Sequence, residues 1–398
     1  MNRRIFTFLF LLLFIFTRQS AFAQADSGKT TPSYKIAVFA PLYLDSIFND
    51  KGFRYSQGMP KFMMPALDFI QGAQVALDSM SLWDEKVEAT FYDSKAYIKT
   101  IPYLIQNKKL DSLDLIIGSV KDVEYKQLAD FALLKNIPFI SATYPNDGGI
   151  TSNPFTVIIN STLKSHCEAI YSYILQNHST DKIFLCRQKG LQDDKVAGYF
   201  KTLNEREGKP FLTIQTINFD STGSIQGIVK YLDSNRQSII IGASLDEKFA
   251  STLTNTCYSL FPKYSKMTLI GMPNWYSFKI FDTKDALKDF PVYYTSPYYN
   301  AKTDGYSKKL ISAYIKKYKI KPSDMAYKGF ETTYLFTRLL TKFPNDLLSN
   351  LNDKTWKVFC DYAFKPVLLS KEKSTPDYFE NKHLYFIKIM NGTETKAW

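Results

Sequence analysis

The chain has 398 residues, of which 45% are hydrophobic, 22% charged and 16% aromatic. This composition excludes an intrinsically disordered or low-complexity chain, and the length predicts two or three domains of about 150 residues each. The formal net charge of +12 is typical of nucleic-acid-binding proteins, so the compartment has to be settled first.

The segment Met1–Ala23 is typical of a secretory signal peptide. Two arginines near its start precede the apolar run Ile5–Phe16, and a small-x-small cleavage site ends at Ala23. The apolar run is shorter than the about 20 residues that a membrane-spanning helix needs, so we expect cleavage rather than an uncleaved anchor. We therefore predict a periplasmic or secreted protein with a flexible lead-in over residues 24–33.

Removal of the signal peptide takes away three arginines and no acid, which leaves 47 basic and 38 acidic side chains and a net charge of +9. Export argues against nucleic acid as a partner, and the lysines are spread along the chain. The cluster Lys316–Lys321 is typical of a solvated helix end. A weak attraction to an anionic membrane or cell-wall polymer stays open.

Strands and helices alternate from Tyr34 onward. Short β-branched, apolar runs predict strands, and apolar residues at helical spacing predict helices. In the first set, the predicted strands are 35–40, 87–92, 114–117 and 137–141, and the predicted helices are 65–80, 98–109 and 123–134. Such an order predicts a parallel sheet with helices on both faces.

A second set of the same kind begins after a further predicted strand at 155–159. Its predicted strands are 182–186, 211–217, 238–241 and 267–270, and its predicted helices are 163–176, 194–207, 225–233 and 246–260. The last third is less regular, with a strand at 292–295, helices at 304–318 and 324–343, and a strand at 385–390. Asn391 and Gly392 then predict a tight turn.

The four cysteines are far apart in the sequence, with no C-x-x-C pair and no spacing typical of metal ligands: Cys167, Cys186, Cys257 and Cys360. Disulfides and buried free thiols both stay open, and the pairing cannot be deduced from the sequence. We expect no metal and no cofactor.

Five segments follow one another in a characteristic order: KIAVFAPLY at 35–43, FIQGAQVALDSM at 69–80, LIIGSVKDVEYKQLADFA at 115–132, NIPFISATYPN at 136–146 and the helix at 326–340. Together they resemble the type I periplasmic binding proteins, the family of the branched-chain amino-acid binding proteins, in an envelope variant of the Bacteroidetes type. The resemblance implies an α/β fold with two doubly wound parallel-sheet lobes joined by three crossovers. It places lobe one at 34–158 plus 297–355, and lobe two at 159–296 plus 356–398.

In open parallel sheets, ligands lie beyond the carboxyl ends of the strands, where helices begin. This rule gives the candidate ligand-binding residues: Ser119, Val120, Lys121, Asp122, Ser141, Thr143 and Tyr144 on lobe one, and Arg187, Ser244, Asp246, Asn274 and Trp275 on lobe two. Helix capping is the alternative for Ser119, Asp122 and Asp246. Trp275 is either a core residue or, as its loop favours, exposed. Tyr276, Tyr298 and Tyr299 are further aromatic candidates for stacking on a ligand.

The resemblance also shows where this chain departs from the family. In the amino-acid binders, hydroxyls and amides of lobe one hold the carboxylate, and an acid of lobe two holds the ammonium. Here 120–124 replaces the serine-rich turn, and 270–275 contains no acid. An ordinary α-amino acid is therefore not the expected ligand, and Asp246 is a candidate substitute anchor.

Our first hypothesis is a non-catalytic solute-binding protein that closes on an amino acid, a peptide or a sugar-like ligand, for an ABC-type transporter or a sensor. The alternative is an envelope interaction protein with a protein or peptidoglycan partner and no small-molecule site. We do not expect an enzyme, because the sequence has no G-x-S-x-G, H-E-x-x-H or Walker loop. His166 and Cys167 are adjacent on a predicted helix and point in different directions.

Overall fold

The computed structural model describes residues 33–398 except 57, 82–85, 220–224, 283–286 and 371. The predicted signal peptide, and the lead-in up to residue 32, lie outside the described residues. Within the described residues, no helix combines the length and the apolar character needed to cross a membrane.

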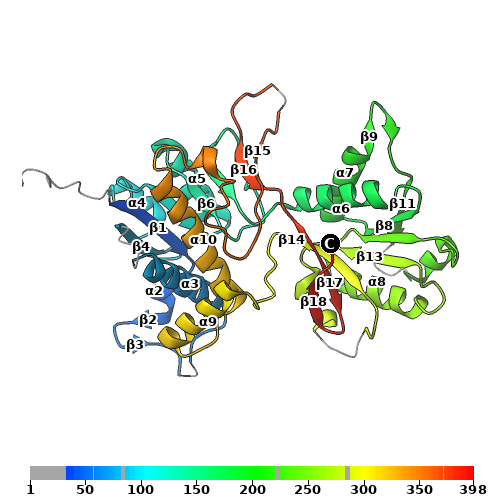
Figure 1. Cartoon of the computed structure of the whole chain (residues 1–398), viewed down its shortest axis with the longest axis horizontal. Helices are drawn as coiled ribbons and strands as arrows, with labels where there is room; N and C mark the ends of the chain where they lie inside the picture. Colours follow the sequence, from blue (N-terminus) through cyan, green and yellow to red (C-terminus); the bar gives the residue numbers. More distant parts are fainter. Residues whose placement is uncertain (1–32, 57, 82–85, 220–224, 283–286, 371) are drawn as a thin grey trace, which may run out of the picture.

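The chain forms two α/β lobes (Figure 1), each built on a seven-stranded sheet. The first sheet has the order β15-β16-β7-β6-β5-β1-β4 and is parallel except for its edge strand β15. Its strands are β1 (Tyr34–Ala40), β4 (Val87–Asp93), β5 (Leu115–Gly118), β6 (Phe139–Ser141), β7 (Thr156–Ile158), β15 (Phe364–Val367) and β16 (Tyr378–Asn381).

The second sheet has the order β11-β8-β12-β13-β14-β17-β18. Its first five strands are parallel, and β17 and β18 add an antiparallel hairpin at one edge. The strands are β8 (Lys182–Gln188), β11 (Ile214–Phe219), β12 (Ser238–Gly242), β13 (Met267–Gly271), β14 (Val292–Ser296), β17 (Tyr385–Met390) and β18 (Thr393–Lys396). The predicted turn at Asn391 and Gly392 joins the hairpin, and both residues have positive φ.

Helices cover the faces of both sheets. Lobe one carries α3 (Met64–Ser81), α4 (Ile101–Gln106), α5 (Asp122–Lys135), α9 (Gly305–Tyr318) and α10 (Asp324–Lys342), and lobe two carries α6 (Leu163–Asn177), α7 (Leu191–Asn204) and α8 (Glu247–Leu260). Shorter elements are α2 (Leu44–Ile47), β2 (Phe48–Asn49), β3 (Gly52–Phe53), β9 (Glu205–Arg206), β10 (Lys209–Pro210), η1 (Ile225–Tyr231), η2 (Trp275–Ser277), η3 (Lys279–Phe281) and η4 (Leu348–Asn350).

The chain crosses between the sheets three times, after β7, after β14 and after β16. The predicted fold class, two parallel-sheet lobes joined by three crossovers, is confirmed. One assignment needs correction: residues 356–398 do not all belong with the second sheet. Strands β15 and β16 extend the first sheet through pairing of β16 with β7, and only β17 and β18 join the second. The exact lobe boundaries stay a prediction.

Three local expectations differ from the structure. Residues 225–231 form a 3₁₀ helix, and this segment contains Gly227 and β-branched residues, which disfavour an α-helix. The helix predicted at 98–109 is shorter, because Thr100 caps α4 and Pro102 fits only its first turn. The capping expected of Ser119 and Asp122 is not seen, since Lys121 occupies the N-cap of α5 and no side chain caps it.

Two glycines allow α3 and α10 to pack in close contact within lobe one. A Cβ atom on Gly72 would lie 2.0 Å from the carbonyl oxygen of Ala326, and one on Gly329 would lie 2.0 Å from that of Phe69. Both neighbours are backbone atoms, which cannot move away cheaply. The cleft-facing side of α10 is therefore fixed by this backbone contact.

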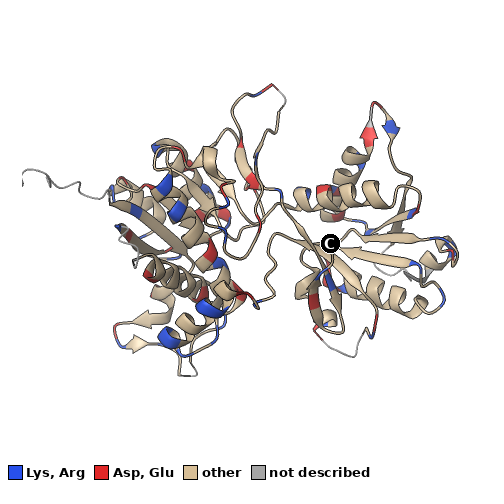
Figure 2. Ribbon diagram, in the orientation of Figure 1, with Lys and Arg blue, Asp and Glu red and all other residues tan. Residues whose placement is uncertain are grey.

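All four cysteines are buried free thiols, which decides between the two states that the sequence left open. Burial raises the pKa of the Cys167 and Cys257 thiols to about 12. Buried, protonated thiols react slowly, because the thiolate is the nucleophile. In the ribbon of Figure 2, positions of basic residues are interspersed with positions of acidic residues over both lobes.

We predict that the native protein does not react with Ellman's reagent within minutes, whereas four thiols per chain react in guanidinium chloride. The physical reason is the burial of every sulfur atom. A count of two or zero thiols in the denatured protein would instead show disulfides.

We predict that Gly329→Ala lowers the free energy of unfolding by about 1–3 kcal/mol, because the added methyl group overlaps the backbone of α3. The matched control is Gly198→Ala in α7, where the added Cβ meets nothing within 4 Å. That change should stabilise the protein by about 0.5–1 kcal/mol. Urea unfolding measures both, and equal effects of the two substitutions would contradict the close contact.

Candidate functional site

A cleft of about 990 Å³ lies between the two lobes. Its walls include residues that lie within three positions after the ends of strands of both sheets: Asn160 after β7, Leu245 after β12, Pro273 after β13 and Pro297 after β14. The cleft therefore lies where the carboxyl ends of the parallel strands face each other, which is the usual ligand position in open α/β sheets.

Tyrosines are prominent in the lining of the cleft. They come from lobe one, from the second crossover and from lobe two: Tyr144, Tyr199, Tyr276, Tyr294, Tyr298, Tyr299, Tyr327 and Tyr378. Tyr276 is 53% exposed and stacks on Tyr294 with ring centroids 5.9 Å apart. Tyrosine offers a ligand both an apolar face and a hydroxyl group.

Two of the twelve sequence-predicted site residues line the cleft, namely Tyr144 and Asn274. The further aromatic candidates Tyr276, Tyr298 and Tyr299 line it too. Asn274 donates from Nδ2 to the carbonyl oxygen of Leu245 at 2.8 Å, and its Oδ1 has no hydrogen-bond partner in the described part of the chain.

The other lobe-one candidates form contacts among themselves and do not line the cleft. The hydroxyl groups of Ser119 and Thr143 are 3.1 Å apart, and the Tyr144 hydroxyl donates to Asp122 at 3.1 Å. Lys121 lies 4.0 Å from the Asp122 carboxylate. Val120 and Ser141 are buried. A binding role for this group stays a prediction.

Three of the lobe-two candidates do not line the cleft and have local structural roles instead. The Arg187 guanidinium forms an ion pair with Asp194 of α7. Asp246 caps α8 by accepting from the Phe249 backbone N–H at 2.7 Å, which is the alternative role that the sequence allowed. Ser244 is fully buried.

The expectation that Trp275 is exposed is wrong, because the indole ring is 0% exposed. It fills a slot above the ends of β12 and β13, where Cβ atoms on Gly242 and Gly271 would lie 2.3 and 2.2 Å from the ring. Its Nε1 donates to the carbonyl oxygen of Ser244 at 2.9 Å. The two strand-ending glycines are the sequence signal for this burial.

The sequence did not identify the charged residues of the cleft. Lys164 of α6 and Lys195 of α7 line it, and neither contacts an acidic side chain among the described residues. Gln192, Lys195 and Tyr199 of α7 line the cleft and have the spacing of a single helix face. This spacing is the sequence pattern from which Lys195 could have been predicted.

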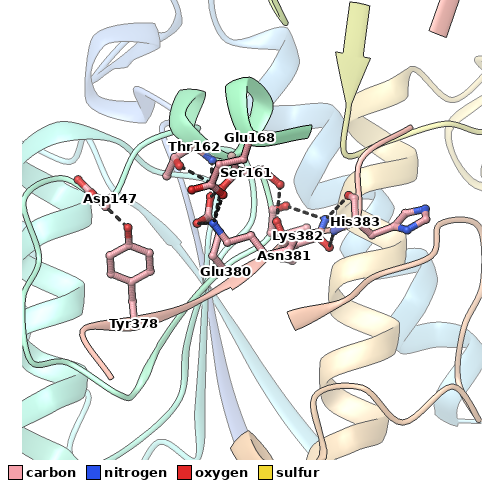
Figure 3. A network of polar contacts seen from close by, with 11 residues as sticks. Asp147, Ser161, Thr162, Glu168, Tyr378, Glu380, Asn381, Lys382 and His383 are labelled. Carbon is pink, nitrogen blue, oxygen red and sulfur yellow. Dashed lines mark hydrogen bonds and ion pairs between the residues drawn. The ribbon is translucent and has the colours of Figure 1, made fainter. Parts of the chain in front are cut away.

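Acidic side chains line the cleft as well. The Asp147 carboxylate accepts from the Gly149 backbone N–H at 3.0 Å and from the Tyr378 hydroxyl at 3.2 Å (Figure 3). Glu394 of β18 accepts from the Tyr294 hydroxyl at 2.9 Å, and burial raises the pKa of its carboxyl group.

Helix α10 brings two further charged groups to the cleft. Glu331 is buried and accepts from the backbone N–H groups of Phe359 and Cys360, at 2.9 and 2.6 Å, and from the Tyr362 hydroxyl at 2.9 Å. Burial raises the pKa of Glu331 despite these hydrogen bonds. Lys328 lies over the Tyr298 ring, 4.2 Å from its centroid, and burial lowers its pKa.

A polar network ties the first crossover to the third (Figure 3). Glu380 is buried, and its Oε1 accepts from the Thr162 backbone N–H at 2.7 Å and from the Ser165 hydroxyl at 2.8 Å. The Lys382 ammonium bridges Glu380 at 2.8 Å and Glu168 of α6 at 3.1 Å. The start of α6 is thus held to the segment that leaves β16.

His166 is buried under the cleft, with Nδ1 2.7 Å from the Thr295 hydroxyl. Burial lowers the pKa of His166 to about 4, which outweighs the opposing effect of the Glu380 charge. The imidazole is therefore neutral at pH 7, and the Cys167 thiol is protonated. In the described residues, no group of three or more His, Cys, Asp or Glu side chains is placed to hold a metal.

Solved structures show which fold this is. One similar chain is a periplasmic ligand-binding protein of a branched-chain amino acid ABC transporter from Burkholderia xenovorans, with 11% identity over 92% of this chain and 95% of that chain and a TM-score of 0.58. A second is an ABC transporter substrate-binding protein from Desulfitobacterium hafniense in complex with leucine, with 12% identity over 92% of this chain and 100% of that chain and a TM-score of 0.57. A third is LivJ from Streptococcus pneumoniae in complex with isoleucine, with 14% identity over 92% of this chain and 99% of that chain and a TM-score of 0.51. No family model and no curated protein matches the sequence. The chain has the fold of the type I periplasmic binding proteins, as the resemblance implied.

We predict that the stability of the protein falls between pH 6.5 and about 4 in part because of His166. The unfolded state binds a proton at the ordinary pKa of 6.5 and the folded state only near 4, so acid favours unfolding. This group alone accounts for about 3 kcal/mol once the pH is below 4. Urea unfolding at several pH values in this range should show that the free energy of unfolding depends less steeply on pH for His166→Gln than for the unchanged protein. If the free energy of unfolding changed with pH in parallel for the two proteins, the buried, neutral state of the imidazole would be refuted.

Proposed function

We propose that the protein is an extracytoplasmic solute-binding protein, not an enzyme, whose two lobes close on a small polar ligand. The observation that carries the proposal is the cleft, which lies beyond the carboxyl ends of both sheets and is lined from both lobes and the crossovers. The lining combines exposed tyrosine faces with lysine and carboxylate groups that can orient a ligand.

The connections between the lobes support closure by rotation. Lobes joined only by short crossovers can move about them without disturbing either core, which is the usual hinge arrangement. Residues 159–162, 297–304 and 382–384 are the segments that join the sheets and helices of the two lobes. A ligand that contacts both walls would favour the closed form, since it binds that form more tightly.

The proposed compartment is the periplasm or the extracellular space, after cleavage near Ala23. The expected partner of the closed form is a membrane permease of ABC type or another envelope protein. The similar solved structures support this assignment, because one of them is described as periplasmic and as part of an ABC transporter.

The absence of catalysis is part of the proposal. His166 is buried and neutral, and the Cys167 beside it is a buried thiol with a raised pKa. Neither group is in a state suited to nucleophilic chemistry.

We predict that native mass spectrometry of the purified protein shows a stoichiometric ligand, and that small-angle X-ray scattering shows a smaller radius of gyration when the ligand is added back. Tyr276→Ala should weaken binding about tenfold or more, because the ring is an exposed wall of the cleft. Tyr306→Ala is the control, since Tyr306 is 56% exposed and does not line the cleft.

A protein that binds none of a broad set of amino acids, peptides, sugars and wall fragments, and whose scattering never changes, would contradict the proposal. Capture of an envelope protein by that unchanged form would favour the interaction-protein alternative.

A further inference from the structure

We infer that the cleft binds a short peptide lengthwise, with the carboxylate end of the peptide beside α6 and α7 and its ammonium end beside β18. Because it names the ligand class of the same cleft, this inference rests on the proposed function. It follows from how the charges without ionic partners are distributed along the cleft walls.

One end of the cleft is basic. Lys164 lies in the first turn of α6 and Lys195 in the second turn of α7, and neither contacts an acidic side chain among the described residues. Both lie near helix N-termini, where the helix dipole also favours an anion. One acid of lobe one, Asp147, lines the cleft too, but its carboxylate already accepts hydrogen bonds from Gly149 and Tyr378.

The other end is acidic. Asp324, at the start of α10, and Glu394 of β18 both line the cleft. Lys302 forms an ion pair of 2.6 Å with Asp324, and its charge also acts on Glu394, which accepts a hydrogen bond from the Tyr294 hydroxyl and forms no ion pair of its own in the described residues. A ligand ammonium beside Glu394 would form the ion pair that its carboxylate lacks.

The strands beside which the two ends lie are further apart than the ammonium and carboxylate of one amino acid. Strand β8, which α7 follows, is separated from β18 by four strands, or about 24 Å at about 4.8 Å per strand spacing. Lys164 lies nearer, because His166 in the same turn contacts Thr295 of β14, which is about 10 Å from β18 by the same spacing. In an α-amino acid the ammonium and carboxylate share one carbon atom. An extended peptide of about three to seven residues spans these distances.

The walls between the ends suit a peptide. Tyrosine rings supply contact area at low entropic cost, and their hydroxyl groups can pair with peptide groups. Lys328 lies over the Tyr298 ring and contacts no acidic side chain in the described residues, so its ammonium can donate to peptide carbonyl groups. A neutral sugar would leave the basic and the acidic end without ionic partners.

The test uses a library of randomised pentapeptides with free termini. The purified protein is incubated with the library, the complex is isolated by size exclusion, and the bound peptides are identified by mass spectrometry. The best peptide is then synthesised in three forms: free, N-acetylated and C-amidated. We expect each blocked form to bind at least tenfold more weakly in calorimetry, because each lacks one charge.

Two isosteric or near-isosteric variants assign the ends. Lys195→Gln should weaken binding of the free peptide about tenfold and should change the affinity for the C-amidated form little. Glu394→Gln should likewise weaken binding of the free peptide about tenfold and should change the affinity for the N-acetylated form little. Lys201→Gln is the matched control, because Lys201 lies on α7 outside the cleft lining and should change neither affinity.

A peptide whose affinity is unaffected by both blocking groups would overturn the inference. So would the selection of no pentapeptide from a preparation that closes on some other ligand, and in that case the proposed function stands. If no ligand of any kind binds and the scattering does not change, the proposed function fails together with the inference.

Discussion

The ion pair between the buried Glu380 and the partly exposed Lys382 ties two of the three crossovers together. Glu380 lies in β16 of the first sheet and accepts a hydrogen bond from the backbone at the start of α6 in lobe two. Lys382 adds an ion pair with Glu168 on that helix. Removing Lys382 would leave the buried Glu380 charge without its cation, at a cost of at most about 3–5 kcal/mol. Two of the three crossovers are therefore held to each other by this network.

Helix α10 connects the core of lobe one to the cleft. On one side, Gly329 allows the helix to touch the backbone of α3, and on the other Lys328 and Glu331 lie at the wall of the cleft. Burial lowers the pKa of Lys328 and raises that of Glu331, so both groups carry a cost of desolvation. Glu331 recovers part of this cost through three hydrogen bonds to residues 359–362. The same helix packing thus sets the position and the energy of two charged groups in the cleft.

Local sequence patterns predicted most of the fold, because strand and helix periodicity depends on neighbours a few residues apart. They did not predict β15, β16 and β18, which are short and partly polar; β16 joins its sheet by pairing with β7, more than 200 residues earlier in the sequence, and β15 and β18 extend the sheets from β16 and β17. Trp275 shows the same limit. Its loop favoured exposure, but Gly242 and Gly271 from two different strands leave room for the ring.

By itself, the sequence determined the alternation of strands and helices, the two-lobed α/β class and the end of the sheets at which a ligand site lies. The alternation follows from apolar spacing, and the position of the site from the rule that parallel strands present their carboxyl ends together, whereas the two-lobed class was implied by the resemblance to a known family. Only the tertiary structure decided which side chains line the cleft. Lys164, Lys195 and Glu394 come from segments that are as far as 230 residues apart, and their placement depends on how helices pack and strands pair. The distribution of charge along the cleft is therefore a property of the folded chain.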